Sequence, residues 1–401
     1  MAGYRDLLRT RGVARIMTAQ LAARFPNGMT SLAVLLHVER VTGSYAAAGL
    51  VLAATSIGQA VAGPVTSRWM GRWGMRPVLT LTLAVCALAI AGLALLPLPV
   101  PGYMALGLIA GLSTPPVQSA VRTIYPKMVT SRQLTPLFSL DASLQEIIWI
   151  VAPVVITFVA TQIGTLEALL LIVAILVGGG SWFILSPEVG RVRIPRSRRG
   201  FGRVLLKAPV LLATVAGFLL IAACSAVEVG VVATFGHSGA AAGLVLAVFS
   251  VGSLAGGLTF GHIPIGPWAM ARRLTIVAVG LALAVFALDV WWLGGTLFLA
   301  GIGIAPALAV IFAITSASVR FSETAEAYGW IGTGQLIGAA AGSAVAGFLI
   351  DGVGPQGAYV AAAGFAAVGV LVAVACVRGF PDLRERDASP IPDTEPVSTI
   401  T

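Results

Sequence analysis

Charged residues are scarce in this chain of 401 residues. Asp, Glu, Lys and Arg together make up 10% of it, whereas hydrophobic residues make up 58%. A soluble globular protein carries roughly 25% charged residues, so this sequence lacks the polar surface that would keep it in water. The composition excludes a soluble enzyme or binding domain and predicts a protein that crosses a lipid bilayer several times.

Cysteine and histidine are rare as well. The cysteines, Cys86, Cys224 and Cys376, lie in separate apolar segments, and the three histidines are scattered, so we expect no metal site and no disulfide framework. The net charge of +9 does not indicate binding to nucleic acid, because the basic residues lie between apolar segments and form no stripe with aromatic residues. The sequence also lacks a Gly-rich phosphate-binding loop, so no nucleotide cofactor is expected.

Long apolar segments, by contrast, are abundant. A membrane-spanning helix needs about 20 apolar residues, and turn residues or charges separate twelve segments that are long enough. The expected spans are residues 13–37, 44–68, 77–98, 102–126, 134–162, 165–186, 207–234, 239–262, 271–291, 293–318, 324–350 and 355–378. The predicted fold class is therefore an all-α polytopic membrane protein with twelve transmembrane helices.

Basic residues gather in alternate connections between these spans. Arginines precede the first span and follow the second, and seven basic residues lie between Arg191 and Lys207. The remaining connections contain Arg40 and almost nothing else that is basic. Because short loops rich in Lys and Arg stay in the cytoplasm, both termini and the middle connection are expected to be cytoplasmic, in a protein integral to the plasma (inner) membrane.

The middle connection divides the chain into two related halves. The string AAAGLVLA occurs at Ala46–Ala53 and again at Ala240–Ala247, at equivalent places in two successive sets of six spans. Eight consecutive identities indicate a duplicated fold. The expected organisation is an N-terminal six-helix bundle over 1–186, a basic cytoplasmic linker over 187–206, a C-terminal six-helix bundle over 207–379 and a disordered, proline-rich cytoplasmic tail over 380–401.

Two six-helix halves, repeated in parallel around a basic middle loop, resemble the major facilitator superfamily of transporters. The similarity covers essentially residues 10–380 and includes the loop after the second span. The glycine and basic positions of the family's signature in that loop are matched by Gly63, Arg72, Gly74 and Arg76. Gly71 occupies the acidic position, so the charge relay of the signature is incomplete. The resemblance implies two pseudo-symmetric bundles and a gating role for this loop.

A charged residue lies in the middle of the first span. Arg24 costs about 2.5–3.5 kcal/mol at that depth, so it must face a polar interior or a charged partner. Gln20, Asn27 and Ser31 follow the same helical face, which predicts the wall of a substrate cavity. Further candidates for this cavity are Gln118, Gln145 and Gln335. A structural ion pair between two helices is the alternative interpretation of Arg24.

The fifth span carries two acidic residues, Asp141 and Glu146. Arg122 and Asp141 are nearly symmetric about the preceding turn, so they are expected to form a structural pair. Glu146 lies deeper, and the resemblance makes the first and fifth spans neighbours, so Arg24 is its expected partner. A carboxylate between an apolar surround and an arginine can titrate when substrate arrives, which makes Glu146 the first candidate for proton coupling. Glu228, in the seventh span, is the second, unless it only reaches the outer interface.

The eleventh span begins with Glu323 and Glu326, which are expected to cap the helix because acidic side chains favour its N-terminus. Gly334, Gly338 and Gly342 follow as two successive Gly-x-x-x-Gly steps. Such steps allow close helix packing, and in the resembling fold this helix lies between the two halves. The glycines are therefore expected at the contact between the halves.

These patterns predict a secondary transporter, not an enzyme, that works by alternating access with a substrate site near the membrane midplane. Proton-coupled efflux of a drug-like or amphipathic metabolite is the first hypothesis, because the expected cavity is largely apolar. Import or facilitated passage of a sugar or of an organic anion, attracted by Arg24, is the alternative. A membrane enzyme or a non-transporting scaffold is disfavoured by the short outer loops and by the cost of buried charge. The expected partners are a small-molecule substrate, protons and lipid, and we expect a monomer.

Overall fold

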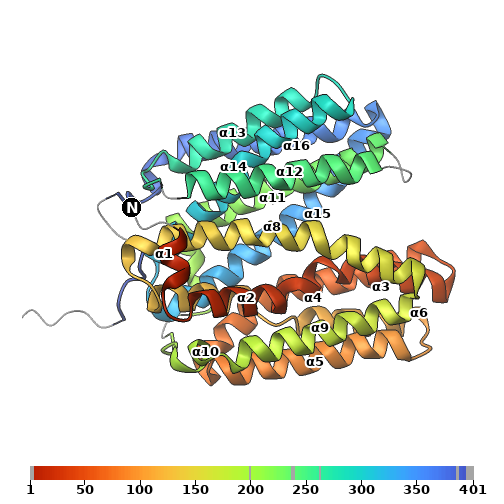
Figure 1. The fold of residues 1–401 in the computed structure, drawn as a ribbon, viewed down its shortest axis with the longest axis horizontal. Coiled ribbons are helices and arrows are strands. Elements are labelled where there is room, and N and C mark those ends of the chain that lie inside the picture. The colour runs from red at the N-terminus through yellow and green to blue at the C-terminus, as the bar shows by residue number, and fades with distance from the viewer. Residues whose placement is uncertain (1–3, 198–199, 236–239, 262, 385–387, 394–401) are drawn as a thin grey trace, which may run out of the picture.

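The computed structural model describes residues 4–197, 200–235, 240–261, 263–384 and 388–393. Helices account for nearly all of the described chain, and they form two elongated lobes that lie side by side (Figure 1). The N-terminal helices, red to yellow-green, make the lower lobe in this view, and most of the C-terminal helices, green to blue, make the upper one.

The first span of the N-terminal lobe is broken. Helix α2 (Val13–Arg24) ends at a 3₁₀ turn, η1 (Phe25–Gly28), and α3 (Thr30–Thr42) begins after it. The break coincides with Pro26, which has no backbone N–H to donate to a continuous helix. The other long helices of this lobe are α4 (Tyr45–Trp73), α5 (Met75–Leu95), α6 (Val100–Leu112), α7 (Val117–Ile124), α8 (Ser131–Gln162) and α9 (Thr165–Leu185).

The C-terminal lobe repeats this arrangement. Its helices are α11 (Ala208–Phe235), α12 (Ala240–Phe260), α13 (Ala269–Ala284), α14 (Val290–Ser318), α15 (Thr324–Val353) and α16 (Gln356–Ala375). Short elements complete the described chain: α1 (Tyr4–Arg9), η2 (Tyr125–Lys127), α10 (Pro187–Arg191), η3 (Arg203–Leu206), η4 (Phe321–Glu323) and η5 (Val377–Gly379).

All twelve expected spans contain helix. Within the described residues, ten segments are long and apolar enough to cross a membrane. The remaining two spans are the broken first one and α13, which has 16 residues. The all-α, twelve-span fold predicted from the sequence is thereby confirmed, and the chain is an integral membrane protein.

The two lobes meet where α4 packs against α15 and where α8 packs against α12 and α14. A Cβ atom added to Gly329 would lie 2.6 Å from the carbonyl oxygen of Gly63, so α4 and α15 approach this closely only because both positions are glycine. Between α8 and α12, the Ser139 hydroxyl donates to the carbonyl oxygen of Gly257 at 2.8 Å.

The glycine steps of α15 have a different position from the expected one. A Cβ atom at Gly338 or Gly342 would collide with the backbone of Phe218 or Ala222, both on α11 of the same lobe. The expectation that these glycines join the two halves is therefore wrong. They pack α15 against α11, and it is Gly329, nearer the start of α15, that faces the other lobe.

The expected disorder of residues 380–401 does not hold for the part of the tail that is described. Ile391 lies beside the α14–α15 connection: its N–H donates to Val319 O at 2.9 Å, and its carbonyl accepts from Phe321 N–H at 3.0 Å. The Asp393 carboxylate accepts from the Ser322 hydroxyl at 2.5 Å. Residues before proline favour extended backbone, and here that backbone finds hydrogen-bond partners. Residues 385–387 and 394–401 lie outside the described residues.

Candidate functional site

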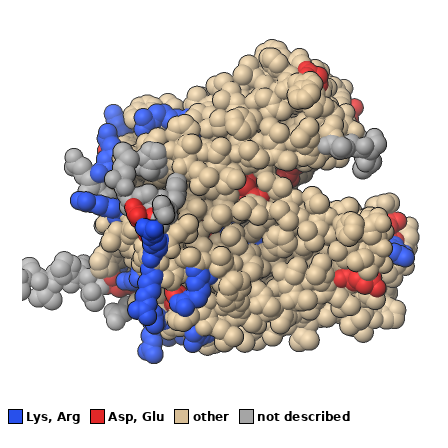
Figure 2. All heavy atoms as spheres, viewed as in Figure 1, with Lys and Arg blue, Asp and Glu red and all other residues tan. Residues whose placement is uncertain are grey.

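A cleft separates the two lobes. Figure 2 shows that it opens at one end of the molecule, whereas Lys and Arg gather at the opposite end, which we call the basic end. Acidic atoms are visible along the walls of the cleft in the same view. The lobes are in contact at the basic end, so the cleft is open at one end only.

Three interactions close the basic end. The Arg68 guanidinium, at the end of α4, lies 2.6 Å from the Glu326 carboxylate on α15. The second carboxylate oxygen of Glu326 accepts from the backbone N–H of Gly202, in the linker, at 2.8 Å. The Thr333 hydroxyl on α15 donates to the carbonyl oxygen of Ala60 on α4 at 2.6 Å. Glu326 therefore joins both lobes and the linker.

Two cation–π contacts also cross between the lobes. The Arg122 guanidinium lies 3.4 Å from the centre of the Phe312 ring on α14, and the Lys127 ammonium lies 4.4 Å from the Phe321 ring. Such contacts strengthen when they are desolvated, and Arg122 is 2% exposed. The N-terminal lobe thus places two of its cations on aromatic rings of the C-terminal lobe.

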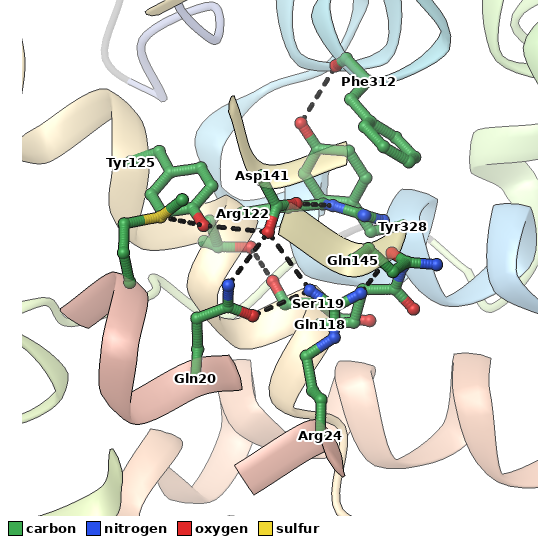
Figure 3. Close-up of polar contacts among 12 residues, drawn as sticks. Gln20, Arg24, Gln118, Ser119, Arg122, Tyr125, Asp141, Gln145, Phe312 and Tyr328 are labelled. Carbon is green, nitrogen blue, oxygen red and sulfur yellow. Dashed lines mark hydrogen bonds and ion pairs between the residues drawn. The ribbon is translucent and has the colours of Figure 1, made fainter. Parts of the chain in front are cut away.

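Asp141 is the centre of a buried polar network (Figure 3). The carboxylate is fully buried and accepts four hydrogen bonds. The donors are Gln20 at 3.2 Å, Arg24 at 3.1 Å, Arg122 at 3.0 Å and the Tyr125 hydroxyl at 3.2 Å. Because helices α2, α7 and α8 each contribute a residue, the network ties the first, fourth and fifth spans together.

Arg24 is held by the same network. Its guanidinium donates to Gln20 at 2.7 Å, to Asp141, and to the side-chain oxygen of Gln145. Arg24 is only 3% exposed. Two arginines and one aspartate leave the network with one net positive charge, and burial limits the access of a substrate anion to Arg24.

The expected pairing of Arg24 with Glu146 is wrong. Asp141 and Gln145 are four residues apart on α8 and share a face, about 40° apart around the helix, whereas Glu146 is rotated by about 140° from Asp141. Arg24 therefore contacts Asp141 and Gln145, and Glu146 faces away from it. Arg122 pairs with Asp141, the geometry expected from the symmetric positions of the two residues about their turn.

Glu146 lies at the middle of α8 and faces the other lobe. The Ser253 hydroxyl on α12 donates to its carboxylate at 3.0 Å. Glu228, on α11, has an exposed side chain and lies near enough to Glu146 for the two carboxylates to repel each other. Across the described residues neither glutamate has a basic partner within ion-pair distance. The structure thus brings together two unpaired carboxylates, one from each lobe.

The other expected cavity residues lie in three different places. Gln118 lies between Arg122 and Gln145 at the edge of the network and is partly exposed (Figure 3). Asn27 and Ser31 lie in and beyond the 3₁₀ break, so the single face expected for a continuous helix is interrupted; both are exposed. Gln335 belongs to the other lobe, where it packs beside Gly217 of α11.

The residues of the loop signature have distinct local roles. Gly63 lies at the contact between lobes, and Gly74 ends α4 with a left-handed φ of 93°, which glycine adopts without strain. Arg76 donates to the carbonyl oxygens of Ile184 and Ser186 at the end of α9, within its own lobe. Arg72 is exposed. The contact across the lobes is made instead by Arg68 and by Glu326, for which the sequence predicts only a role in capping the helix.

The comparisons with known proteins agree with this architecture. A family model described as Major Facilitator Superfamily matches residues 16–287 and 225–399. No curated protein matches the sequence in a direct search.

Several solved transporters share the fold at 14% sequence identity. A bacterial homologue of the iron transporter ferroportin, in an outward-facing state, superposes with a TM-score of 0.75 and covers 91% of this chain and 99% of its own. The proton:xylose symporter XylE, bound to 6-bromo-6-deoxy-D-glucose, superposes with a TM-score of 0.72, and the match covers 94% of this chain and 97% of XylE. The human organic anion transporter MFSD10 (TETRAN) superposes with a TM-score of 0.69, and the match covers 90% of this chain and 98% of the transporter. At this identity, the likeness concerns the fold alone.

Proposed function

The chain belongs to the major facilitator superfamily, whose members are transporters, and on that premise we propose that it moves small molecules across the membrane by alternating access. The observation that carries the proposal is the cleft between two similar lobes, open at one end and closed at the basic end by Arg68 and Glu326. Rocking of one lobe against the other would close the open end and open the basic one.

Proton coupling is the second part of the proposal. The network of Arg24, Arg122 and Asp141 carries one net positive charge. Glu146 and Glu228, when both are ionised, add two negative charges, so the five residues together carry one net negative charge. Charge inside a membrane protein is costly, so binding of one proton to either glutamate is favoured, because it makes these five residues neutral as a group. Glu146 is the first candidate for the carrier because its hydrogen bond to Ser253 joins the two lobes at the middle of the membrane.

We propose efflux of a drug-like or amphipathic metabolite as the direction and substrate class. The positive-inside rule places the basic end and both termini in the cytoplasm of a plasma (inner) membrane protein, which we take to act as a monomer. An organic anion attracted by Arg24 loses support, because that guanidinium is buried and already bound to the Asp141 carboxylate. The two unpaired carboxylates favour a neutral or cationic substrate instead.

A polyhydroxylated substrate is the second candidate. The partly exposed amides of Gln118 and Gln145 lie together at the edge of the network. Amide groups both donate and accept hydrogen bonds, which suits the hydroxyl groups of a sugar. A sugar importer of this kind would use the same cleft and the same rocking motion.

Transport by purified protein in proteoliposomes tests these alternatives. Ethidium and xylose serve as probes, each measured with and without an imposed pH gradient. We expect the gradient to drive ethidium, and Glu146→Gln to abolish the driven component. Glu167→Gln is the matched control, because Glu167 is exposed at the start of α9. Gradient-driven xylose with no ethidium transport would favour the sugar candidate, and movement of xylose without any effect of the gradient would contradict proton coupling.

A further inference from the structure

Arg273, on α13, is a buried cation that has no acidic partner in the described part of the chain. Its side chain donates to the carbonyl oxygens of Pro306, at 2.7 Å, and of Ile263, at 3.5 Å, and the residue is 7% exposed. Among the described residues, no carboxylate lies within ion-pair distance of it. An uncompensated buried charge is strongly unfavourable, so an anion from outside the chain would stabilise this guanidinium.

A cavity of about 150 Å³ lies directly beside Arg273, between α12, α13 and α14. Its walls are apolar and include Phe260, Ile276 and Ile302. Phe260 is 39% exposed, so this cavity lies at the surface of the bundle rather than in the central cleft. Its lining suits a hydrocarbon chain and offers little to a small hydrophilic anion.

A second cavity, of about 300 Å³, adjoins the first through Arg272, which lines both. Its walls include Trp268, which is 51% exposed, and Arg384. Arg384 is engaged by the Asp382 carboxylate, with Nε at 3.0 Å from both of its oxygens. The Arg272 side chain has no ion-pair partner among the residues that are described. The positive charge offered to a ligand is therefore that of Arg272 and Arg273.

We infer that these two cavities form a binding site for one anionic phospholipid. The phosphate lies against the exposed Arg272, near the buried Arg273, and supplies the missing counter-charge, and part of an acyl chain occupies the apolar cavity. Trp268 has the amphipathic ring that is enriched where membrane proteins meet the headgroup region. Basic pockets between transmembrane helices are a recognised way of binding such headgroups. The lipid would join α12, α13 and α14 at the basic end, away from the transport cleft.

Lipid binding to the full chain, purified in a neutral detergent, tests the inference. Native mass spectrometry would follow titration with dioleoyl phosphatidylglycerol and, separately, with dioleoyl phosphatidylcholine. We expect tighter binding of the glycerol lipid, and a loss of about fivefold in its affinity in Arg272→Gln, the effect of one cation near a headgroup. Arg132→Gln, an exposed arginine of the other lobe, is the control and should bind as the unmodified protein does.

Two further arms separate a lipid from a free anion. Ile276→Trp fills the apolar cavity and leaves both arginines in place, so it should weaken phosphatidylglycerol binding without unfolding the protein in a thermal melt. Inorganic phosphate at millimolar concentration should not displace the lipid. Equal binding of the two lipids, equal effects of Arg272→Gln and Arg132→Gln, or displacement by inorganic phosphate would each overturn the inference. If Ile276→Trp does not fold, the arginine variants still decide the question.

Discussion

The guanidinium of Arg68 lies 2.6 Å from the carboxylate of Glu326, although 258 residues separate them in the sequence. The first residue belongs to the N-terminal lobe and the second to the C-terminal lobe. The Glu326 side chain is 5% exposed, and the linker residue Gly202 also donates to it. This pair can exist only while the basic end is closed, so it stabilises one of the two states that alternating access requires.

Loss of this pair should favour opening of the basic end. Arg68→Gln leaves Glu326 buried without its ion-pair partner, at a cost of about 2 kcal/mol, which corresponds to about a 30-fold change in the ratio of the two states. Spin labels at positions 73 and 268, both exposed at the basic end, should move apart in pulsed electron paramagnetic resonance. The native cysteines are replaced by serine in all variants.

Arg15→Gln is the control for this prediction. Arg15 pairs with Glu188 of α10, which lies at the start of the linker and packs against α5, α7 and α9 of the N-terminal lobe. Its loss should therefore leave the label distance unchanged. The charge-reversed pair Arg68→Glu with Glu326→Arg should restore the original distance. An unchanged distance in Arg68→Gln would show that the pair does not hold the basic end closed.

The glycine contact between α4 and α15 gives a prediction with a control on the same helix. Gly329→Ala places a Cβ atom 2.6 Å from Gly63 O, so the lobes must separate, whereas Gly332→Ala places one in open space. Both changes carry the same gain in helix propensity, about 0.5–1 kcal/mol. A reporter thiol is introduced by Ser67→Cys in the cysteine-free background, because Ser67 is buried on α4 one turn from Gly63. We expect only Gly329→Ala to expose this thiol to a water-soluble maleimide, and equal labelling of the two variants would contradict a tight contact at Gly329.

The buried network predicts an order of stabilities. Asp141→Asn leaves Arg24 and Arg122 without a counter-charge, a loss of about 3–5 kcal/mol for a broken buried pair. Arg24→Leu leaves Arg122 and Asp141 as a neutral pair and should cost less. Thermal unfolding of the purified variants should show the larger decrease in melting temperature for Asp141→Asn. The reverse order would mean that Asp141 is not the centre of the network.

Most of the fold could be predicted from the sequence. Hydropathy determines which segments enter a bilayer, and the alternation of basic loops determines on which side of the membrane each connection lies. The break at Pro26 could have been anticipated from the missing N–H, but its effect on Asn27 and Ser31 could not. The expected face assumes a continuous α-helix, and the 3₁₀ turn, with fewer residues per turn, changes the rotation of the side chains that follow it.

The site was predicted less completely, because depth in the membrane does not determine direction around a helix. Arg24 and Glu146 are both deep, and the expected pairing of the two follows from their depth and from the first and fifth spans being neighbours. The spacing on α8 carried a better signal: Asp141 and Gln145, four residues apart, share the face that Arg24 contacts. Glu326 had no such signal, since an acid at the start of a helix is equally consistent with capping, and only the packing of the lobes brings it to Arg68.

The most direct test of the account is whether substrate movement drives protons through Glu146. Proteoliposomes would contain the pH indicator pyranine, and a substrate found in the vesicle screen would be added outside at equal internal and external pH. Exchange of inward-moving substrate for outward-moving protons should raise the internal pH with the unmodified protein and with Glu167→Gln. With Glu146→Gln, substrate should still equilibrate while the internal pH stays constant. A full pH response in Glu146→Gln would contradict the assignment of Glu146 as the carrier, and no response in the unmodified protein would contradict proton coupling itself.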